Sequence, residues 1–325
     1  MVVPLLRLPE NATRLVLQIM EVKDSLALSI LSYKVRDLVR NTLYNIKPLI
    51  ITVDVGRIIT IKVSDLFLVQ FYTVNKDRQC KMFTPRTAMV SSGNERRSQK
   101  WKNPKMKIKD WLDHLNHVFK QNKTDLMNFS PGFERFDFEA LRRNIQSVKA
   151  LKIPEGLSHE QSKMIFEKFF HIFEFPFLEG NVFGNREELR KSLLSSFDHL
   201  IYGRNERVTD FRLDDLLMIN TRSIFLTGES LTEKELNRFL KLWMAGMSSN
   251  PCVLHLKYPS NRVIDKKEVL KGINYQEFED DRVLTVSNHF GENDVKGGID
   301  IHGKNGNKAV IQFKDSNKIN IYVCY

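Results

Sequence analysis

Two groups of side chains in this sequence have the types and spacing that could do chemistry. His114 and His117 lie three residues apart beside Asp113, so a helix would place both imidazoles on one face, where they could ligate zinc. No Cys and no Glu-x-x-His sequence nearby completes such a site, and an amphipathic helix explains the spacing better. Asp214 and Asp215 could form an acid–base pair, but adjacent helical residues point in different directions, and acids at a helix start favour its dipole.

The common catalytic signatures are missing from the sequence. It contains no GxxxxGK[ST] phosphate-binding loop, no GxGxxG, no GxSxG and no HExxH. A group of glycines near the C-terminus lies among alternating residues and is expected in turns. These are Gly297, Gly298, Gly303 and Gly306. We therefore expect a protein that is not an enzyme and that uses neither a metal nor a cofactor.

Composition indicates a folded, basic chain. The 325 residues carry 50 Lys and Arg against 39 Asp and Glu, a net charge of +11, and 42% are hydrophobic, which leaves room for two domains. Cys80, Cys252 and Cys324 are widely spaced and odd in number, which favours reduced thiols and a cytoplasmic or nuclear location. No apolar run is long enough to span a membrane, and the N-terminus does not resemble a signal peptide, so we expect a soluble protein.

The first 45 residues have the pattern of three short helices. Leu8-Pro9 favours an extended backbone before the first helix. We expect Asp24 to cap the second helix and Ser32 the third. The apolar stripe of the first helix contains Leu15, Val16, Ile19 and Met20. Helices this short are marginal alone, and their apolar residues occupy more than one face. Part of this surface should contact another protein, although a helical lead-in packed on the rest of the chain has the same pattern.

Residues 46–107 are expected to form a β-rich connector. Branched and aromatic residues alternate with period two, and a turn at Gly56 suggests a small antiparallel unit. Residues 76–109 hold eleven Lys or Arg and two acids, and 91–105 have the composition of a polar loop. Basic residues around Trp101 could bind nucleic acid, and such binding would weaken steeply as the salt concentration rises. The run lacks, however, the interleaved aromatic residues on which bases stack. A contact with an acidic protein surface is the better expectation.

From residue 108 onward, helices and strands alternate. Strands separated by helical connections should lie parallel. Predicted strands are 148–153, 197–203, 223–227 and 253–258, and predicted helices are 160–170, 213–219 and 232–244. The later strand centres are about 25 to 30 residues apart, the spacing of leucine-rich repeats. We expect an irregular, leucine-rich-repeat-like βα array.

The C-terminal residues return to period two and predict a β cap. Residues 299–301 and 309–313 should form a hairpin with a two-residue Asn305-Gly306 turn, followed by a strand at 319–323. The alternation would leave three polar residues facing water, namely Asp300, Lys308 and Gln312. The expected fold class is α+β: a three-helix N-terminal unit, antiparallel strands, the βα array and a C-terminal hairpin cap.

Leu8-Pro9-Glu10 through Val39 resemble the F-box without a gap. The F-box is a helical motif of about 40 residues that docks on the Skp adaptor of SCF-type (Skp, cullin, F-box) ubiquitin ligases. The resemblance implies a Skp-family adaptor, and through it a cullin, as partners. It also implies a set of adaptor contacts: Leu8, Pro9, Val16, Leu17, Met20, Leu26, Leu28, Leu31 and Lys34. Ala12 and Val35 depart from the motif, where a larger aliphatic residue and tryptophan are usual, so a scaffold with a degenerate F-box stays an alternative.

A second resemblance covers the C-terminal part. The segments 110–115, 213–220, 236–243 and 297–301 are similar to the F-box-associated domain of type 2, found behind F-boxes in a large nematode family. That domain implies a protein substrate held by residues 108–325. Together the two resemblances imply a non-catalytic substrate-recognition subunit of an SCF-type ligase, with a substrate that the sequence does not identify.

Overall fold

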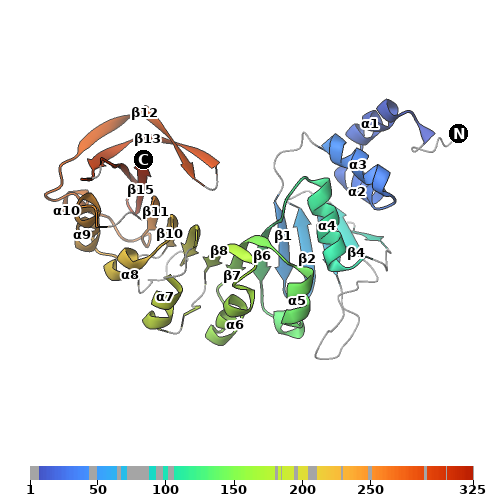
Figure 1. Cartoon of the computed structure of the whole chain (residues 1–325), viewed down its shortest axis with the longest axis horizontal. Coiled ribbons are helices and arrows are strands. Elements are labelled where there is room, and N and C mark those ends of the chain that lie inside the picture. Colours follow the sequence, from blue (N-terminus) through green and yellow to red (C-terminus); the bar gives the residue numbers. More distant parts are fainter. Residues whose placement is uncertain are drawn as a thin grey trace. The chain divides into compact units, whose positions relative to one another are not determined.

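The computed structural model describes two compact units. Unit 1 comprises residues 1–154 and 167–173, and unit 2 comprises residues 155–166 and 174–325. The structure describes residues 7–43, 50–63, 67–71, 88–92, 98–101, 106–179, 182–183, 185–193, 197–203, 211–227, 230–247, 251–288, 291–304 and 306–324. Elements are labelled in Figure 1.

Unit 1 begins with the three predicted helices. They are α1 (Glu10–Ile19), α2 (Val22–Ser29) and α3 (Tyr33–Thr42), drawn in blue in Figure 1. The side chain of Ser32 accepts a hydrogen bond from the Val35 N–H at 3.3 Å, which confirms the predicted cap of α3. The predicted cap of α2 is wrong: the N-cap is Glu21, three residues before Asp24. Asp24 instead lies in the first turn, where its charge still favours the helix dipole.

The sheet of unit 1 combines antiparallel and parallel strands. Strands β1 to β5 pair antiparallel in succession, of which the alternation of residues predicted β1 to β3. β1 also pairs in parallel with β6, which pairs in parallel with β7. Their bounds are β1 (Ile51–Val55), β2 (Ile59–Val63), β3 (Phe67–Phe71), β4 (Ala88–Ser92), β5 (Ser98–Trp101), β6 (Thr124–Phe129) and β7 (Val148–Ile153). The described part of 91–105 belongs to strands β4 and β5, so the loop prediction is wrong there, and most of the basic stretch lies outside the described residues.

Helices and aromatic side chains complete the core of unit 1. The helices are α4 (Ile108–Val118) and α5 (Phe138–Asn144), with a short 3-10 turn η3 (Phe133–Arg135) between β6 and α5. The Phe129 ring lies 5.5 Å from Phe133 and 5.2 Å from Phe169, which ends α6 (His159–Phe169). These fully buried rings fill the interior beneath the strands.

Unit 2 contains the predicted parallel βα alternation. The strands β8 to β11 pair in parallel wherever their pairing is described. The elements in chain order are β8 (Phe173–Leu178), α7 (Arg186–Leu193), β9 (His199–Tyr202), α8 (Leu213–Met218), β10 (Ser223–Thr227), α9 (Glu233–Met244) and β11 (Val253–Lys257). Leu236, Phe239 and Leu240 of α9 are buried, as expected for an amphipathic helix packed on a sheet. The leucine-rich-repeat-like character of this array stays a prediction.

An antiparallel cap ends unit 2. After α10 (Lys266–Val269) come β12 (Gln276–Asn288), β13 (Gly291–His302), β14 (Lys308–Lys314) and β15 (Lys318–Cys324). β15 pairs antiparallel with β11, and the order continues through β14 and β13 to β12. The hairpin prediction is confirmed, but His302 pairs with Lys308, so five residues connect the strands rather than a two-residue turn. The sequence analysis missed β12 because its acidic residues do not alternate with apolar ones.

Two residues predicted to face water are buried. Asp300, which belongs to β13, is 4% exposed, and Gln312 of β14 is 6% exposed, and residues of the β12–β13 hairpin bond to both. Arg282 donates two hydrogen bonds to the Asp300 carboxylate, at 2.7 and 2.8 Å, and Gln312 donates to the Lys296 carbonyl at 2.6 Å. Burial opposes ionisation of Asp300, but hydrogen bonds from Arg282 and Lys308 outweigh it and lower the pKa. Only Lys308 of the three predicted water-facing residues stays partly exposed.

A pair of glycines lets the hairpin bend over the sheet. Gly297 and Gly298 have φ values of +59° and +101°, opposite an irregularity in β12 between Phe278 and Val283. A Cβ on Gly298 would lie 2.9 Å from a Val310 methyl group. Beyond the bend, two valines of the hairpin, Val286 and Val295, pack in one cluster with the sheet residues Val253, Val310 and Tyr322.

Replacing Gly298 tests this bend. Gly298→Ala combines positive-φ strain with overlap against Val310, so we expect the free energy of unfolding to fall by about 3 kcal/mol. Gly156→Ala is the matched control, because Gly156 has φ +96° with no atom within 4 Å of an added Cβ. It should lose only about 1 kcal/mol. Urea denaturation of both variants measures the difference; equal losses would show that the close approach at Gly298 is unimportant.

Candidate docking surfaces

The three N-terminal helices expose large apolar side chains. Ile19 is 85% exposed, Tyr33 78%, Leu31 68% and Leu15 64%. Single exposed apolar residues are normal on a protein surface, but two on α1, one in the turn after α2 and one at the start of α3 indicate a contact surface. We call these four residues the N-terminal apolar surface.

The predicted adaptor contacts fall into two classes. Leu17 and Leu26 are each 1% exposed, so they pack inside the helical unit. Leu8, Val16, Met20 and Leu28 are partly exposed, and Pro9, Leu31 and Lys34 are exposed. The sequence analysis did not name Leu15, Ile19 or Tyr33 as contacts. For α1 the helical period could have indicated the exposed residues. Thr13 and Leu17 lie four residues apart on its buried face. Leu15 and Ile19 are also four residues apart but are offset by two from that pair, so they point away from the buried face.

Helix α4 holds the N-terminal helices through its two histidines. The Ser29 hydroxyl of α2 lies 2.7 Å from His114 Nε2, and the Asp37 carboxylate of α3 lies 2.8 Å from His117 Nε2. The hydrogen bond from His117 is the main reason why the pKa of Asp37 is lowered. The two imidazoles therefore bond to two different helices. Among the described residues, no three His, Cys, Asp or Glu side chains gather where they could hold a metal ion.

His114 is a buried neutral side chain. It is 7% exposed, and burial lowers its pKa to about 4, with smaller contributions from the charges of Arg36 and His117. The Ser29 hydroxyl donates its one proton to the Leu26 carbonyl at 2.7 Å, so it accepts the hydrogen bond from His114, whose neutral imidazole then carries its proton on Nε2. The junction between α2 and α4 is thus a closed polar contact inside an apolar core.

The acidic pair at the start of α8 holds neighbouring elements together. Asp215 is fully buried and accepts hydrogen bonds from Arg190 Nε and from the Arg212 N–H, both at 2.9 Å. Asp214 lies 3.5 Å from Arg190. The hydrogen bond to Asp215 raises the pKa of Arg190. These contacts join α7 to α8, as expected for acids that begin a helix.

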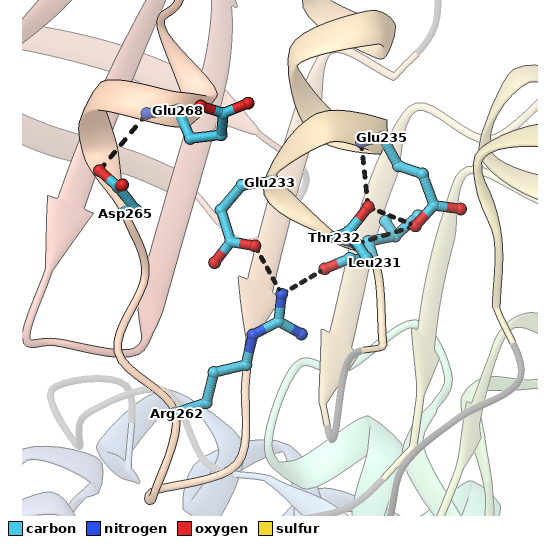
Figure 2. A network of polar contacts seen from close by, with 7 residues as sticks. All are labelled: Leu231, Thr232, Glu233, Glu235, Arg262, Asp265 and Glu268. Atoms are coloured by element: carbon cyan, nitrogen blue, oxygen red, sulfur yellow. Dashed lines mark hydrogen bonds and ion pairs between the residues drawn. The ribbon is translucent and has the colours of Figure 1, made fainter.

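A second polar network fixes the start of α9 (Figure 2). Thr232 and Glu235 form a capping box, in which the Glu235 N–H donates to the Thr232 hydroxyl and the Thr232 N–H donates to Glu235. Arg262 donates to the Leu231 carbonyl and to the Glu233 carboxylate, both at 3.0 Å. The network ties the loop before α10 to the start of α9.

The parallel strands of unit 2 present a second candidate surface. On one face Leu200, Ile224 and Leu254 are at most 3% exposed, whereas their neighbours Ile201, Phe225 and His255 stay partly exposed. Successive strand residues point to opposite faces, so these neighbours share the other face of the sheet. The sequence analysis found the strands but named no residue of this face as a site.

Comparison with known proteins gives one family match. A family model described as FBA_2, F-box associated, matches residues 188–257, from α7 through β11. No family model matches the N-terminal helices, and neither the curated proteins nor the solved structures contain a match. The matched segment includes Asp215, the capping box of α9 and the partly exposed sheet face. No helix in the described ranges is long and apolar enough to cross a membrane.

The His114 junction predicts a pH-dependent stability. Below pH 6.5 the unfolded chain takes up a proton at this position, whereas the folded chain takes it up only near pH 4, so the free energy of unfolding falls as the pH drops through this window. We expect this group to contribute a loss of about 2 kcal/mol between pH 7 and pH 5. Urea denaturation of the wild type and His114→Gln at both pH values measures it. The same pH dependence in both proteins would contradict the assignment.

Proposed function

We propose that this chain is a substrate-recognition subunit of an SCF-type ubiquitin ligase. The observation that carries the proposal is the F-box-associated match at residues 188–257. The same chain has a three-helix N-terminal unit with an exposed apolar surface, which suits a docking module. Each feature supplies one of the two contacts that such a subunit needs.

The proposed mechanism is positional. The N-terminal helices dock on a Skp-family adaptor, which links the chain to a cullin, while unit 2 holds a protein target. Binding both partners at once raises the effective concentration of the target's lysines near the ubiquitin-charged enzyme. The buried positions of Asp215 and His114 suit this role, because neither group has to reach a substrate.

The adaptor contacts are refined by side-chain exposure. We assign the centre of the contact to Ile19 and Leu31, which are aliphatic and are 85% and 68% exposed, with Pro9 and Lys34 at its edge. Leu17 and Leu26 act by holding the helices in place. Val35, one of the two departures from the motif, is 2% exposed, so its size affects packing within the unit.

An interaction scaffold without a ligase is the second candidate. Two observations favour it: no family model matches the N-terminal helices, and Ala12, which is partly exposed, is smaller than the usual aliphatic residue. In that case the N-terminal apolar surface would bind a different partner.

A pull-down with a recombinant Skp adaptor tests the proposal. The full-length chain should bind, and Ile19→Glu with Leu31→Glu should weaken binding at least about tenfold, because two charges would be buried in the contact. Leu8→Ala with Pro9→Ala tests the predicted edge of the same contact and should weaken binding less. Quantified recovery of the adaptor over a concentration series is the measurement.

Two exposed apolar residues of unit 2 provide the matched control. Met247 is 74% exposed and Val263 is 73% exposed, so Met247→Glu with Val263→Glu introduces the same charge at similar exposure. This control should bind the adaptor like the wild type. No binding by the folded wild-type chain would reject the ligase proposal and place the scaffold first.

A further inference from the structure

A single row of residues crosses the partly exposed sheet face of unit 2. Strand pairing places Phe177, Ile201, Phe225, His255 and Asn320 directly beside one another in that order. All five are partly exposed, although they lie in the interior strands of a sheet whose other face is closed. We call this set the aromatic row.

The centre of the aromatic row is pre-arranged. The Phe225 and His255 rings are stacked, with centroids 4.3 Å apart and planes 16° from parallel. Asn320 holds the imidazole through a hydrogen bond of 2.7 Å to Nδ1, and the Tyr322 ring contacts it edge-on at 5.4 Å. Flat side chains already fixed in position lose little entropy when another surface covers them.

Two residues further along the same face, lysines replace the apolar residues. Lys257 pairs with Lys318, and Lys318 pairs with Lys314, so three lysines stand side by side on three neighbouring strands. Like charges directly opposite each other destabilise a sheet. Asp315 forms an ion pair with Lys318 at 2.6 Å. The pKa of His255 is lowered mainly by burial and further by the charge of Lys314. The aromatic row therefore lies within reach of the positive potential of the lysines.

The β12–β13 hairpin makes a wall beside the lysines. A hollow of about 500 Å³ lies there, and Lys296, Gln312 and Lys314 are among the residues that line it. This volume is in the range of pockets that hold a small ligand or a few side chains. The wall also carries Asp280 and Asp294, which line the same hollow. Because Lys296 belongs to the same wall, the hollow itself is mixed in charge, and the positive potential of this face comes from the three neighbouring lysines.

We propose that the aromatic row and the adjoining lysines form a binding surface for an acidic, aromatic-containing peptide segment of the target protein. The aromatic side chain would cover the Phe225–His255 stack, and the acidic side chains would face Lys257, Lys318 and Lys314. This assignment rests on the proposed function, since it names the target surface of the same subunit. Charge complementarity selects the acidic partner, because a basic segment would add to the repulsion among the lysines.

Fluorescence anisotropy with a defined probe tests the surface. The probe is a fluorescein-labelled peptide Asp-Glu-Phe-Asp-Glu-Phe-Asp, and its twin has Lys in place of every acid. The full-length chain at 50 mM salt should bind the acidic peptide at least about tenfold more tightly than the twin. Lys257→Glu with Lys318→Glu should weaken binding of the acidic peptide at least about tenfold. Raising the salt to 0.5 M should weaken binding of the same peptide to the wild type.

The matched control reverses two charges on α9. Lys234 and Lys241 are exposed there, so Lys234→Glu with Lys241→Glu makes the same change in net charge outside the aromatic row. This variant should bind within about twofold of the wild type. Absent binding of the acidic peptide, equal binding of the twin, or equal losses in both double variants would overturn the proposal.

The adaptor pull-down separates this test from that of the ligase. The Lys257→Glu and Lys318→Glu variant should recover the adaptor like the wild type, and the Ile19→Glu and Leu31→Glu variant should bind the acidic peptide like the wild type. Loss of adaptor binding alone rejects the ligase proposal, whereas loss of peptide selectivity alone rejects the peptide surface.

Discussion

The arrangement of unit 2 depends on the two-residue period of its parallel strands. Each strand turns one side chain toward a closed face, where Ile224 and Leu254 are at most 1% exposed, and the next toward the other face. One closed face is enough to stabilise the array through burial of apolar area. The opposite face is closed only in part: the β12–β13 hairpin packs on Val253 and Tyr322, while the residues of the aromatic row stay partly exposed.

Sequence patterns predicted much of the secondary structure, because strand alternation and helix capping depend on residues close together in the chain. β7 and β10 have their predicted bounds, and Ser32 caps α3, since alternation and capping depend on neighbouring residues. The errors at Asp300 and Gln312 have a different origin. Both residues alternate as if exposed, but Arg282 of β12 bonds to Asp300 and the Lys296 carbonyl of β13 accepts from Gln312. The alternation of polar and apolar residues in a strand does not predict that another hairpin will fold over that strand.

The candidate surfaces were predictable to different degrees for the same reason. The N-terminal helices could be located from spacing, but only packing separates the buried Leu17 and Leu26 from the exposed Ile19. His114 shows the limit most clearly. Its spacing from His117 suggests a shared ligand, yet the two rings bond to α2 and α3, which lie some eighty residues earlier in the chain. The aromatic row could not be found at all before the pairing of strands was known.

The acidic bulge of β12 has a consequence for how copies of this protein behave together. β12 is a terminal strand in the order of its sheet, and a straight terminal strand offers unpaired backbone groups to the strands of other molecules. Between Phe278 and Val283 the register shifts, and Glu279, Asp280 and Asp281 occupy the displaced segment. A second copy that approached edge to edge would meet a broken ladder and a matching set of negative charges. The segment that shapes the cap therefore also disfavours backbone pairing between the β12 strands of two copies.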